Sequence, residues 1–575
     1  MMFMANSSIL GLFNEGRRQI MKKALANIRT LAAVLMTSAA LVACNKEYNA
    51  TAEQTPQVYT LTIQAGMNDG TQTKALELEG TKLVAKWEEG ETVEVRKGAT
   101  LLGNLTVSNV SADGQSCTLS GTLTGDIRRE DTMRLYYHRT GLVNESQTGT
   151  LVSAAESDYA VARVEVDSVD GDNISLKSNP SFETQVAMLK LTMKDGSANL
   201  LNATSLQITI GDIAPYTFSP TAATYTANGD GVVYFALPSA SRLSADSGTS
   251  LDVAGLAAAS VTFTATVGAD TYTVTKTGYA FAAGKYYATT LTMAKIISLS
   301  GRFPGDDELV IADGCILTDF AVGQSYKVSI ADGATVTLRD VENNGKIEDH
   351  GTILEYRPGI KCLGDATIIL EGNNTVTGGD QYAGIYVPGD KTLTIRGTGS
   401  LNVTGGYSAA GIGGNATGDA NCGSIVISGG TVTATGGSGG AGIGLGANGG
   451  ECKDITISGG TVTATGGSNG AGIGLGTSWG GCKAITISGG TVTAMGSDQA
   501  PGIGGIEGVY ESITITGDVT KVTATKGPWA QYSIGIEDDY SWEDCGPITI
   551  GGTVYFQYGN FTNDDLMTSS FVYQP

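Results

Sequence analysis

Histidine is nearly absent from this sequence, because only His138 and His350 occur among its 575 residues. So small a supply of imidazole argues against histidine-based zinc sites and catalytic triads. Basic residues are also outnumbered, with 35 Lys and Arg against 57 Asp and Glu, which gives a net charge of −22. Such an acidic chain repels the phosphates of nucleic acids, so we expect no nucleic-acid partner.

The apolar run at residues 31–43 has 13 residues and is too short to span a bilayer as a helix. It follows a basic stretch that begins at Met21, and it ends in Leu41-Val42-Ala43-Cys44. This order of features is typical of an export signal and resembles the bacterial lipobox. We therefore expect residues 1–43 to be an upstream extension and a signal peptide. Cys44 is then the lipidated residue that anchors the protein to the outer membrane.

Residues 44–56 are polar and are expected to form a tether behind the lipid. Within them, Asn45-Lys46-Glu47 partly resembles the short signal that sends lipoproteins of the Bacteroides group to the cell surface. A solvated linker without signalling content is the alternative interpretation. The predicted location is the cell outer membrane, with the protein facing outward.

Helix-period segments of any length are missing from residues 57–295, where apolar and polar residues alternate with period two instead. Residues 58–63, 187–193 and 260–267 are examples, and turn sequences such as Asn68-Asp69-Gly70 separate such runs. Many short strands with polar turns predict an antiparallel β-sandwich region.

Three short motifs in this region suggest a family. They are Thr73-Lys74-Ala75, then Trp87-Glu88-Glu89-Gly90-Glu91, and finally Gly284-Lys285-Tyr286-Tyr287 before a last strand. The pattern resembles the fimbrillin-like domains of Bacteroides-type lipoproteins, although Glu91 stands where Asp is usual. The resemblance implies a fimbrial subunit or surface module and supplies no catalytic residues. From its chemistry alone, Trp87 is expected to be a core anchor.

Glycine is abundant, with 81 residues that crowd toward the C-terminal end among Val, Ile and Thr. A repeat explains them, because near-identical segments begin at Cys422, Cys452 and Cys482, with a period of 30 residues. Each period holds three short β-type segments separated by glycine. This pattern predicts the coils of a parallel β-helix over residues 296–575.

Stacking of the coils predicts ladders of identical residues inside the solenoid. The predicted ladders are Ile425, Ile455 and Ile485; Ile427, Ile457 and Ile487; Val432, Val462 and Val492; and Ile443, Ile473 and Ile503. The threonines that alternate with them should face outward, and we interpret them as a solvated face.

Four cysteines share one phase of the repeat, and Tyr510 takes that phase in the coil between Cys482 and Cys545. The absence of Cys-x-x-Cys pairs and histidine partners argues against a metal site. Disulfides between coils are an alternative in an exported protein. We favour a ladder of small buried thiols.

The loops before the cysteine phase vary while the strands repeat, and this variation marks a candidate binding edge. Asp419, Trp479, Glu507 and Trp542 each stand six residues before the first Ile of the next strand. Aromatic rings beside carboxylates are suited to binding a glycan, and the carboxylates are also suited to binding calcium. Merely solvated loops, with tryptophans that cap the end of the solenoid, are the alternative. The predicted ligand-binding residues are Trp479, Tyr510, Trp542, Asp419 and Glu507.

A second resemblance covers about 220 residues of this region. Residues 359–372 and 383–389, together with the Ala-Gly-Ile-Gly repeats, resemble a bacterial carbohydrate-binding β-helix family that is related in fold to polysaccharide lyases. The resemblance implies carbohydrate binding with calcium, but it transfers no individual ligand residue.

Three functions compete. The first is a surface adhesin or glycan-binding lipoprotein without enzymatic activity. The second is a fimbrial subunit or tip protein with fimbrial subunits as partners. The third is a polysaccharide lyase-like enzyme, which needs a base beside carboxylates. Lys453 and Lys483 are the only basic residues in the regular coils, and no carboxylate cluster repeats along one face, so the lyase is the least favoured.

Overall fold

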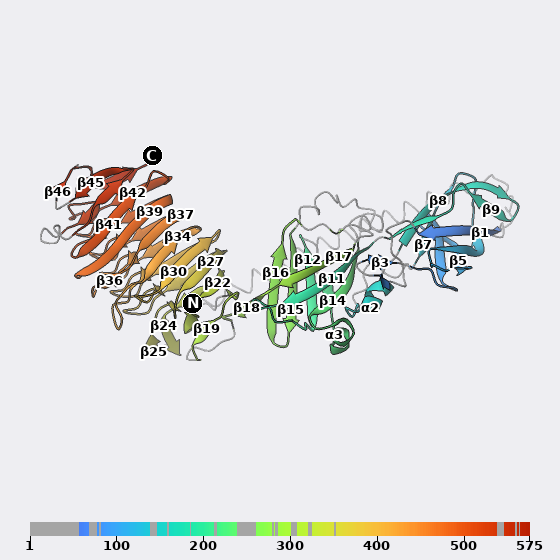
Figure 1. The fold of residues 1–575 in the computed structure, drawn as a ribbon, viewed down its shortest axis with the longest axis horizontal. Helices are drawn as coiled ribbons and strands as arrows, with labels where there is room; N and C mark the ends of the chain where they lie inside the picture. Colours follow the sequence, from blue (N-terminus) through green and yellow to red (C-terminus); the bar gives the residue numbers. More distant parts are fainter. Residues whose placement is uncertain are drawn as a thin grey trace, which may run out of the picture.

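The structure is a computed structural model, and Figure 1 shows three β-rich bodies that follow one another along the long axis. It describes residues 57–575 except 68–76, 80–81, 85, 138–146, 158–159, 185, 212–215, 239–259, 279–280, 282–285, 301–306, 320–324, 350–351, 538–544, 558–559 and 563. The predicted signal peptide, the lipidated Cys44, the tether to residue 56, and the motifs at 68–70, 73–75 and 284–285 lie outside these ranges. The fold is all-β as predicted, and the helices among the described residues are short.

The first body is one sheet that closes on itself. Its strands are β1 (Val58–Met67), β4 (Thr92–Lys97), β5 (Thr100–Ser108), β6 (Ser116–Thr124), β7 (Thr132–Tyr137), β8 (Ala160–Asp170), β9 (Asn173–Leu176) and β10 (Ser181–Thr184). Strand β1 pairs antiparallel with β6 and parallel with β9 and β10, which both pair with β8. The first part of the predicted sandwich region is therefore a closed barrel, since closure leaves β1 bonded on both sides. The strands β2 (Glu77–Glu79) and β3 (Lys82–Val84) form a separate small hairpin.

Trp87 is 3% exposed and lies in the core of this barrel. Its ring makes edge contacts with Tyr137 at 4.7 Å and with Phe182 at 5.3 Å between centroids. The prediction of a core anchor is confirmed.

The second body is a sandwich of two sheets. One sheet holds β11 (Val186–Lys194), β14 (Val232–Pro238) and β17 (Tyr286–Thr292), and the other holds β12 (Ser205–Ile210), β13 (Tyr216–Phe218), β15 (Val261–Val267) and β16 (Asp270–Lys276). Period-two alternation turns Leu189, Leu191 and Met193 inward onto a shared core. The short helices α2 (Leu151–Glu156) and α3 (Ala222–Asn228) contact β14.

Strand β18 (Ala294–Ser298) joins the sandwich to the third body. It pairs antiparallel with β16 and parallel with β20 (Ile316–Thr318), the first strand of its wall in the solenoid. One sheet therefore runs from the sandwich into the solenoid (Figure 1). The predicted boundary between residues 295 and 296 falls inside this strand.

The third body is the predicted parallel β-helix, with three walls. The first wall after β20 contains β22 (Ala334–Arg339), β27 (Ala366–Glu371), β30 (Thr392–Gly397), β33 (Ser424–Ile427), β37 (Ile455–Thr465), β39 (Gly480–Met495), β41 (Val509–Ile515) and β44 (Ile548–Ile550). The second contains β23 (Glu342–Asn344), β28 (Asn373–Thr377), β31 (Ser400–Thr404), β34 (Thr431–Thr435), the later parts of β37 and β39, and β42 (Lys521–Thr525). The third contains β19 (Leu309–Ile311), β21 (Val328–Ile330), β26 (Ile360–Cys362), β29 (Ile385–Tyr386), β32 (Ile412–Gly413), β35 (Ile443–Gly444), β38 (Ile473–Gly474), β40 (Ile503–Gly505) and β43 (Ile534–Ile536).

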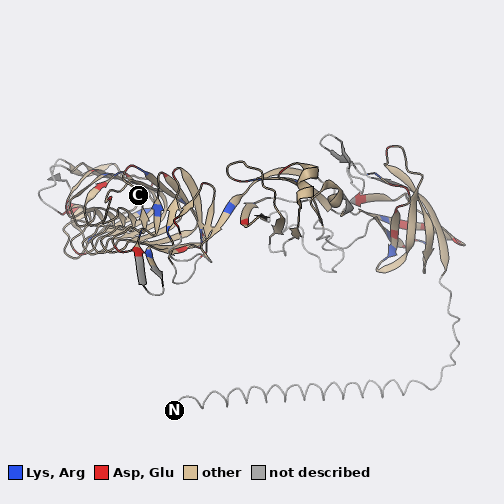
Figure 2. Ribbon diagram, turned by 90° about the horizontal axis from the view of Figure 1, so that it is seen from below, with Lys and Arg blue, Asp and Glu red and all other residues tan. Residues whose placement is uncertain are grey.

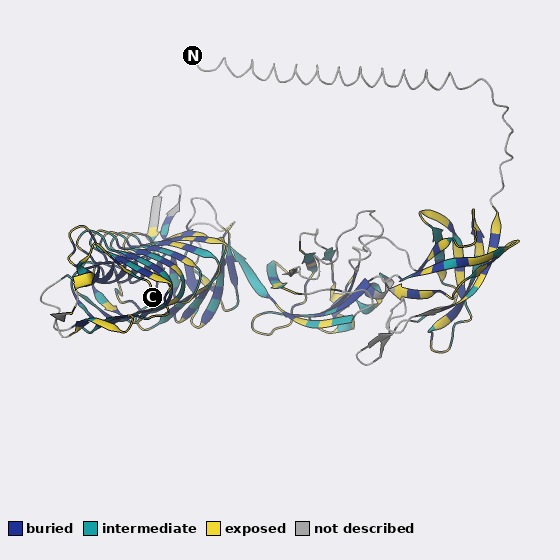
Figure 3. Cartoon of the chain, turned by 90° about the horizontal axis from the view of Figure 1, so that it is seen from above, coloured by how far each residue is buried: buried dark blue, intermediate teal, exposed yellow. Residues whose placement is uncertain are grey.

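All four predicted ladders form in register and are buried. Ile425 pairs with Ile455 and Ile455 with Ile485, and the other three ladders follow the same pattern. Figure 3 shows the buried residues following the strands of the coils. The threonines of β34 face outward, as predicted, because Val432 and Ala434 between them are fully buried.

The C-terminal end of the solenoid is capped by antiparallel strands. β45 (Thr553–Gln557) folds back on β44 and pairs with β46 (Asn560–Phe561), while β47 (Ser570–Tyr573) covers the edge of β42. Between them, η3 (Asp564–Met567) buries Leu566. Such a cap prevents further strands from adding to the last coil. A separate hairpin, β24 (Lys346–Asp349) and β25 (Thr352–Tyr356), is inserted between the second and third walls of an early coil.

Charged residues are scattered along the ribbon, and Figure 2 shows no continuous stretch of Lys and Arg among the described residues. In that part of the chain, no helix has both the length and the apolar character needed to cross a bilayer.

Candidate functional site

The loop edge is the column of positions that stands six residues before the first Ile of a strand in the first wall. Cys422 pairs with Cys452, Gly450 with Gly480 and Gly481 with Val509. This register places Asp419, Gly449, Trp479 and Glu507 in successive coils of one column. The structure thus brings three of the predicted residues together, and Trp542 lies outside the described residues.

The side chain of Trp479 is exposed, at 59%. It stands just before β39, in a loop of glycines and small polar residues. Its neighbour in the preceding coil is Gly449, so no side chain from that position covers the indole. Glu507, in the following coil, is half-buried. The ring is therefore available to a ligand, with a carboxylate one coil away.

Asp419 is exposed, and its carboxylate is held by the chain itself. The hydroxyl of Tyr386 donates to it at 3.1 Å, and so does the backbone N–H of Asn421 at 3.1 Å. Burial and the nearby carboxylate of Asp419 raise the pKa of Tyr386, so this hydroxyl keeps its proton and remains a donor. Asp419 is thus fixed in place, with lone pairs left for a further donor.

The prediction of Tyr510 as a ligand-binding residue is wrong. The side chain is 2% exposed, lies in the solenoid core and follows Cys482 in the inward ladder. Its hydroxyl has no hydrogen-bond partner, and burial raises the pKa of the phenol well above its ordinary value. Side chains at the cysteine position of the repeat point inward, so a residue at this position cannot also belong to the exposed loop edge.

The buried thiol ladder is confirmed. Cys422, Cys452, Cys482 and Cys545 are all buried, and the first three are free thiols. Burial, together with the thiol of Cys422, raises the pKa of Cys452, while the thiol of Cys452 and burial raise the pKa of Cys482. Protonated, inaccessible thiols are poor nucleophiles, so we expect the thiols of this ladder to be chemically inert.

A second row of residues, absent from the sequence-based prediction, lies beside the loop edge. It is formed by the turns between the second and third walls, which we call the turn row. The loop of one coil is hydrogen-bonded to the turn of the preceding one: Ala447 N–H donates to Ser408 O at 2.7 Å and Thr477 N–H to Gly439 O at 2.9 Å. Two exposed rings stand on this row, Tyr407 at 64% and Trp529 at 73%.

The sequence-based prediction did not include these two rings, because it considered only the repeat position that stands six residues before the first Ile of a first-wall strand. The available signal was an aromatic residue in a turn that otherwise reads Gly-Gly-Ser, as at 436–438 and 466–468. Tyr407 follows Gly405-Gly406, and Trp529 follows Gly527-Pro528.

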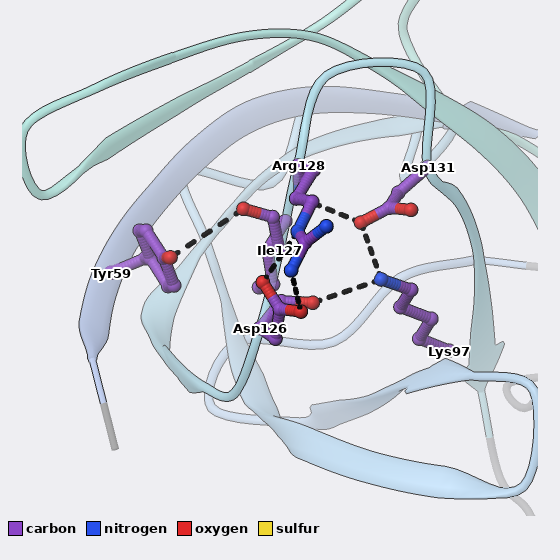
Figure 4. A network of polar contacts seen from close by, with 6 residues as sticks. All are labelled: Tyr59, Lys97, Asp126, Ile127, Arg128 and Asp131. Carbon is purple, nitrogen blue, oxygen red and sulfur yellow. Dashed lines mark hydrogen bonds and ion pairs between the residues drawn. The ribbon is translucent and has the colours of Figure 1, made fainter. Parts of the chain in front are cut away.

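Another polar cluster, in the barrel, is self-contained (Figure 4). Lys97 Nζ lies 2.6 Å from the carboxylate of Asp131 and donates to the carbonyl of Asp126 at 2.9 Å. Arg128 donates its backbone N–H to Asp131 at 2.6 Å and pairs with Asp126 at 2.7 Å. Because these groups satisfy one another, the cluster fixes the turn between β6 and β7 rather than forming a ligand site.

Within the described ranges, no three His, Cys, Asp or Glu side chains gather in a way that would hold a metal ion. The described residues thus offer no cluster of carboxylates for the calcium that the carbohydrate-binding resemblance implies, and calcium stays a prediction.

Comparison with known proteins gives a family match within the solenoid and distant likenesses to solved structures. Residues 425–447, 455–477 and 485–508 match the model of the beta helix repeat. No curated protein matches the sequence.

Among solved structures, a candidate cell adhesion protein of Bacteroides ovatus is 11% identical with a TM-score of 0.25, over 41% of this chain and 95% of that one. A fimbrial protein of the same species is 12% identical with a TM-score of 0.21, over 40% of this chain and only 49% of that one. A fimbrial assembly protein of Parabacteroides distasonis is 13% identical with a TM-score of 0.22, over 41% and 92%. The matched repeats lie in the coils that contain β33, β37 and β39, so these coils are a β-helix by sequence as well as by structure.

Proposed function

We propose that this protein is a surface adhesin that binds glycans through the loop edge of its solenoid, and that it is not an enzyme. The observation that carries the proposal is Trp479, an indole with 59% exposure in the same column as Asp419 and Glu507. An exposed tryptophan on a rigid scaffold offers a flat apolar surface to the C–H face of a sugar. Neighbouring carboxylates accept hydrogen bonds from sugar hydroxyls.

The scaffold supports this role because it fixes the loops at both ends. Each loop is held between the third wall and the first wall, whose backbone bonds continue from coil to coil. A pre-organised site loses little conformational freedom on binding. A site that makes few contacts, here one aromatic ring and two carboxylates, can therefore still bind a ligand.

The lyase alternative finds less support. Lys453 and Lys483 are surface residues that pair with Glu451 at 3.7 Å and Glu511 at 4.0 Å. A lyase of this kind acts on a substrate that carries carboxylates, and the acidic chain, with its net charge of −22, would repel such a substrate. The fimbrial alternative, with fimbrial subunits as partners, would require strand exchange, yet β1 in the barrel is already bonded along both edges.

Membrane attachment forms part of the proposal. Cys44 would carry the lipid that holds the protein on the outer membrane, facing outward. Replacing Cys44 with Ser should move the protein from the membrane fraction to the soluble fraction and abolish labelling by a radioactive fatty acid. Unchanged labelling in the C44S variant would contradict this assignment.

The glycan proposal is tested with the full chain on a glycan array, with calcium and with a chelator. We expect binding that falls strongly in Trp479→Ala and persists in Val152→Ala, a control with 69% exposure on α2. Loss of signal on chelation would assign calcium a part in binding. Absence of binding to every glycan under both conditions would refute the proposal and favour a structural role for the solenoid.

A further inference from the structure

We infer that Tyr407, Trp479 and Trp529 form one binding face for a linear, uncharged polysaccharide that lies parallel to the solenoid axis. This inference rests on the proposed glycan-binding function and specifies its ligand. It adds two residues that the loop edge alone does not contain.

The turn row presents its aromatic rings outward because of the turn geometry. Ala409 N–H donates to Gly406 O at 3.0 Å, and Ala530 N–H donates to Gly527 O at 3.2 Å. Each of these bonds closes a tight turn whose two central residues project from the coil. Tyr407 and Trp529 occupy central positions in their turns, which explains exposures of 64% and 73%.

The turn row and the loop edge belong to one face. The loop of one coil donates to the turn of the preceding coil at three successive levels: Ala416 to Gln381, Ala447 to Ser408 and Thr477 to Gly439, at 2.9, 2.7 and 2.9 Å. Thr477 stands only two residues before Trp479, and Ser408 stands directly after Tyr407. The loop that carries Trp479 is therefore bonded to the row that carries the other two rings.

The rings are spaced at intervals of two coils along the axis. The coil of Tyr407 is marked by Ile412, that of Trp479 by Ile473 and that of Trp529 by Ile534. One coil separates each pair, because Ile412 pairs with Ile443 and Ile443 with Ile473, and then Ile473 with Ile503 and Ile503 with Ile534. With coils about 4.8 Å apart, neighbouring rings are about 10 Å apart along the axis. That is about the length of a disaccharide unit.

The turns between the rings leave the face open. At the turn position of Tyr407 they carry Ser438, Ser468 and Asp498, and at the turn position of Trp529 they carry Gly439, Asn469 and Gln499, none of which is aromatic. A chain that lies along the row would meet a ring at every second sugar and hydroxyl or carboxylate groups between them. A compact branched glycan could contact one ring at a time, so the spacing favours an extended chain.

The charge of the face decides the class of polymer. Asp380 and Asp498 stand in the turns, and Asp419 and Glu507 stand in the loops. Lys526 is the basic residue of the turn that carries Trp529, and its ammonium group donates to the carbonyl of Gln531 at 2.9 Å. The whole chain carries a net charge of −22. Carboxylates accept hydrogen bonds from neutral hydroxyl and acetamido groups, whereas uronate and sulfate groups would be repelled. The ligand class is therefore a neutral, extended polysaccharide.

Calorimetric titration of the full chain with neutral β-1,4-linked glucose, mannose and N-acetylglucosamine oligomers, from disaccharide to hexasaccharide, tests this inference. We expect affinity to rise with length until the oligomer spans all three rings. Tyr407→Ala and Trp529→Ala should each weaken the hexasaccharide about 3- to 10-fold, the factor that one aromatic contact supplies. Trp479→Ala should weaken every oligomer, and Val152→Ala none of them.

Two results would overturn the inference while leaving the proposed function standing. One is affinity that depends on Trp479 but neither on oligomer length nor on Tyr407 and Trp529. The other is preferential binding of a polyuronate or of a branched glycan on the array. If no sugar of any kind binds, the proposed function and the inference both fail. All three rings are exposed, so the variants should fold, and unchanged melting temperatures would verify this.

Discussion

Tyr510 is a large aromatic residue in the column of buried cysteines inside the solenoid. It fills the position held by cysteine in the neighbouring coils, so a large aromatic ring replaces a small thiol within one continuous core. The phenol hydroxyl enters that core without a hydrogen-bond partner. Such a group is tolerated when the packing of its ring offsets the loss of hydration.

Removing this hydroxyl should stabilise the protein or leave it unchanged. We expect Tyr510→Phe to raise the free energy of unfolding by up to about 1 kcal/mol, because an unsatisfied buried donor is lost while the ring remains. Tyr510→Ala should lower it by about 3–5 kcal/mol through the cavity it leaves. Chemical denaturation measures both values, and a destabilised Tyr510→Phe variant would reveal a partner for the hydroxyl. Neither variant should change glycan binding.

The buried thiols make stability fall at alkaline pH. Burial raises the pKa of Cys362 to about 12 from an ordinary value of 9.0. The folded thiol keeps its proton between these values, whereas the unfolded thiol loses it. The contribution is therefore fully present below pH 9 and is lost as the pH rises toward 12.

Denaturation curves at a series of pH values check this, with Cys362→Ala as the variant that should show a shallower alkaline decline. A thiol reagent at neutral pH should label none of the described cysteines until the protein is unfolded. Rapid labelling of the native protein would contradict the buried ladder.

At the level of single residues, the sequence could predict which side chains point inward but not every side chain that points outward. Inward positions repeat, so the ladder of Ile425, Ile455 and Ile485 follows from the period alone. Exposed functional positions do not repeat. Tyr407 and Trp529 occur in separate turns, and only the hydrogen bonds between turns and loops show that they share a face with Trp479.

The third wall is the element that depends most on glycine. Its strands are only two or three residues long in the regular coils, and Gly444 adopts φ of +134°. A Cβ atom at this position would clash with the carbonyl oxygen of Gly474 in the next coil. Glycine therefore permits both the backbone angle and the close approach of the coils.

Gly444→Ala should accordingly destabilise the solenoid by several kcal/mol, on the order of 2–4, through combined strain and clash. Gly517→Ala is the matched control, because nothing lies within 4 Å of a Cβ atom there. It should be neutral or slightly stabilising through the unfolded state. Equal melting temperatures for the two variants would show that the coils can separate at this corner without cost.

At the level of elements, local patterns predicted the strands, while long-range pairing decided their closure. The alternation in 58–63 predicts a strand equally well in a sandwich or a barrel. Only the parallel pairing of Thr60 with Asn173 and of Gly66 with Ser181 closes the sheet. The hairpin of β24 and β25 was also missed, because it interrupts the repeat in a degenerate coil where the period gives no guidance.

For the molecule as a whole, the decisive element is β18, because it belongs to two bodies at once. Ile296 pairs with Thr271 of the sandwich on one side and with Ile316 of the solenoid on the other. The composition changes near residue 296, and a domain boundary placed there by sequence divides this strand. A strand that is hydrogen-bonded on both sides transmits mechanical load and couples the unfolding of its neighbours.

We therefore expect the sandwich and the solenoid to unfold together in calorimetry, apart from the barrel, which has its own core. Ile296→Pro should separate this joint transition into two, because proline removes a ladder hydrogen bond from a central strand and distorts it. Ile296→Val preserves the strand and should leave the transition intact. If the unmodified protein already shows separate transitions for sandwich and solenoid, the bonds of β18 are too weak to couple them. The solenoid would then move on a flexible joint and would not be held at a fixed angle to the sandwich.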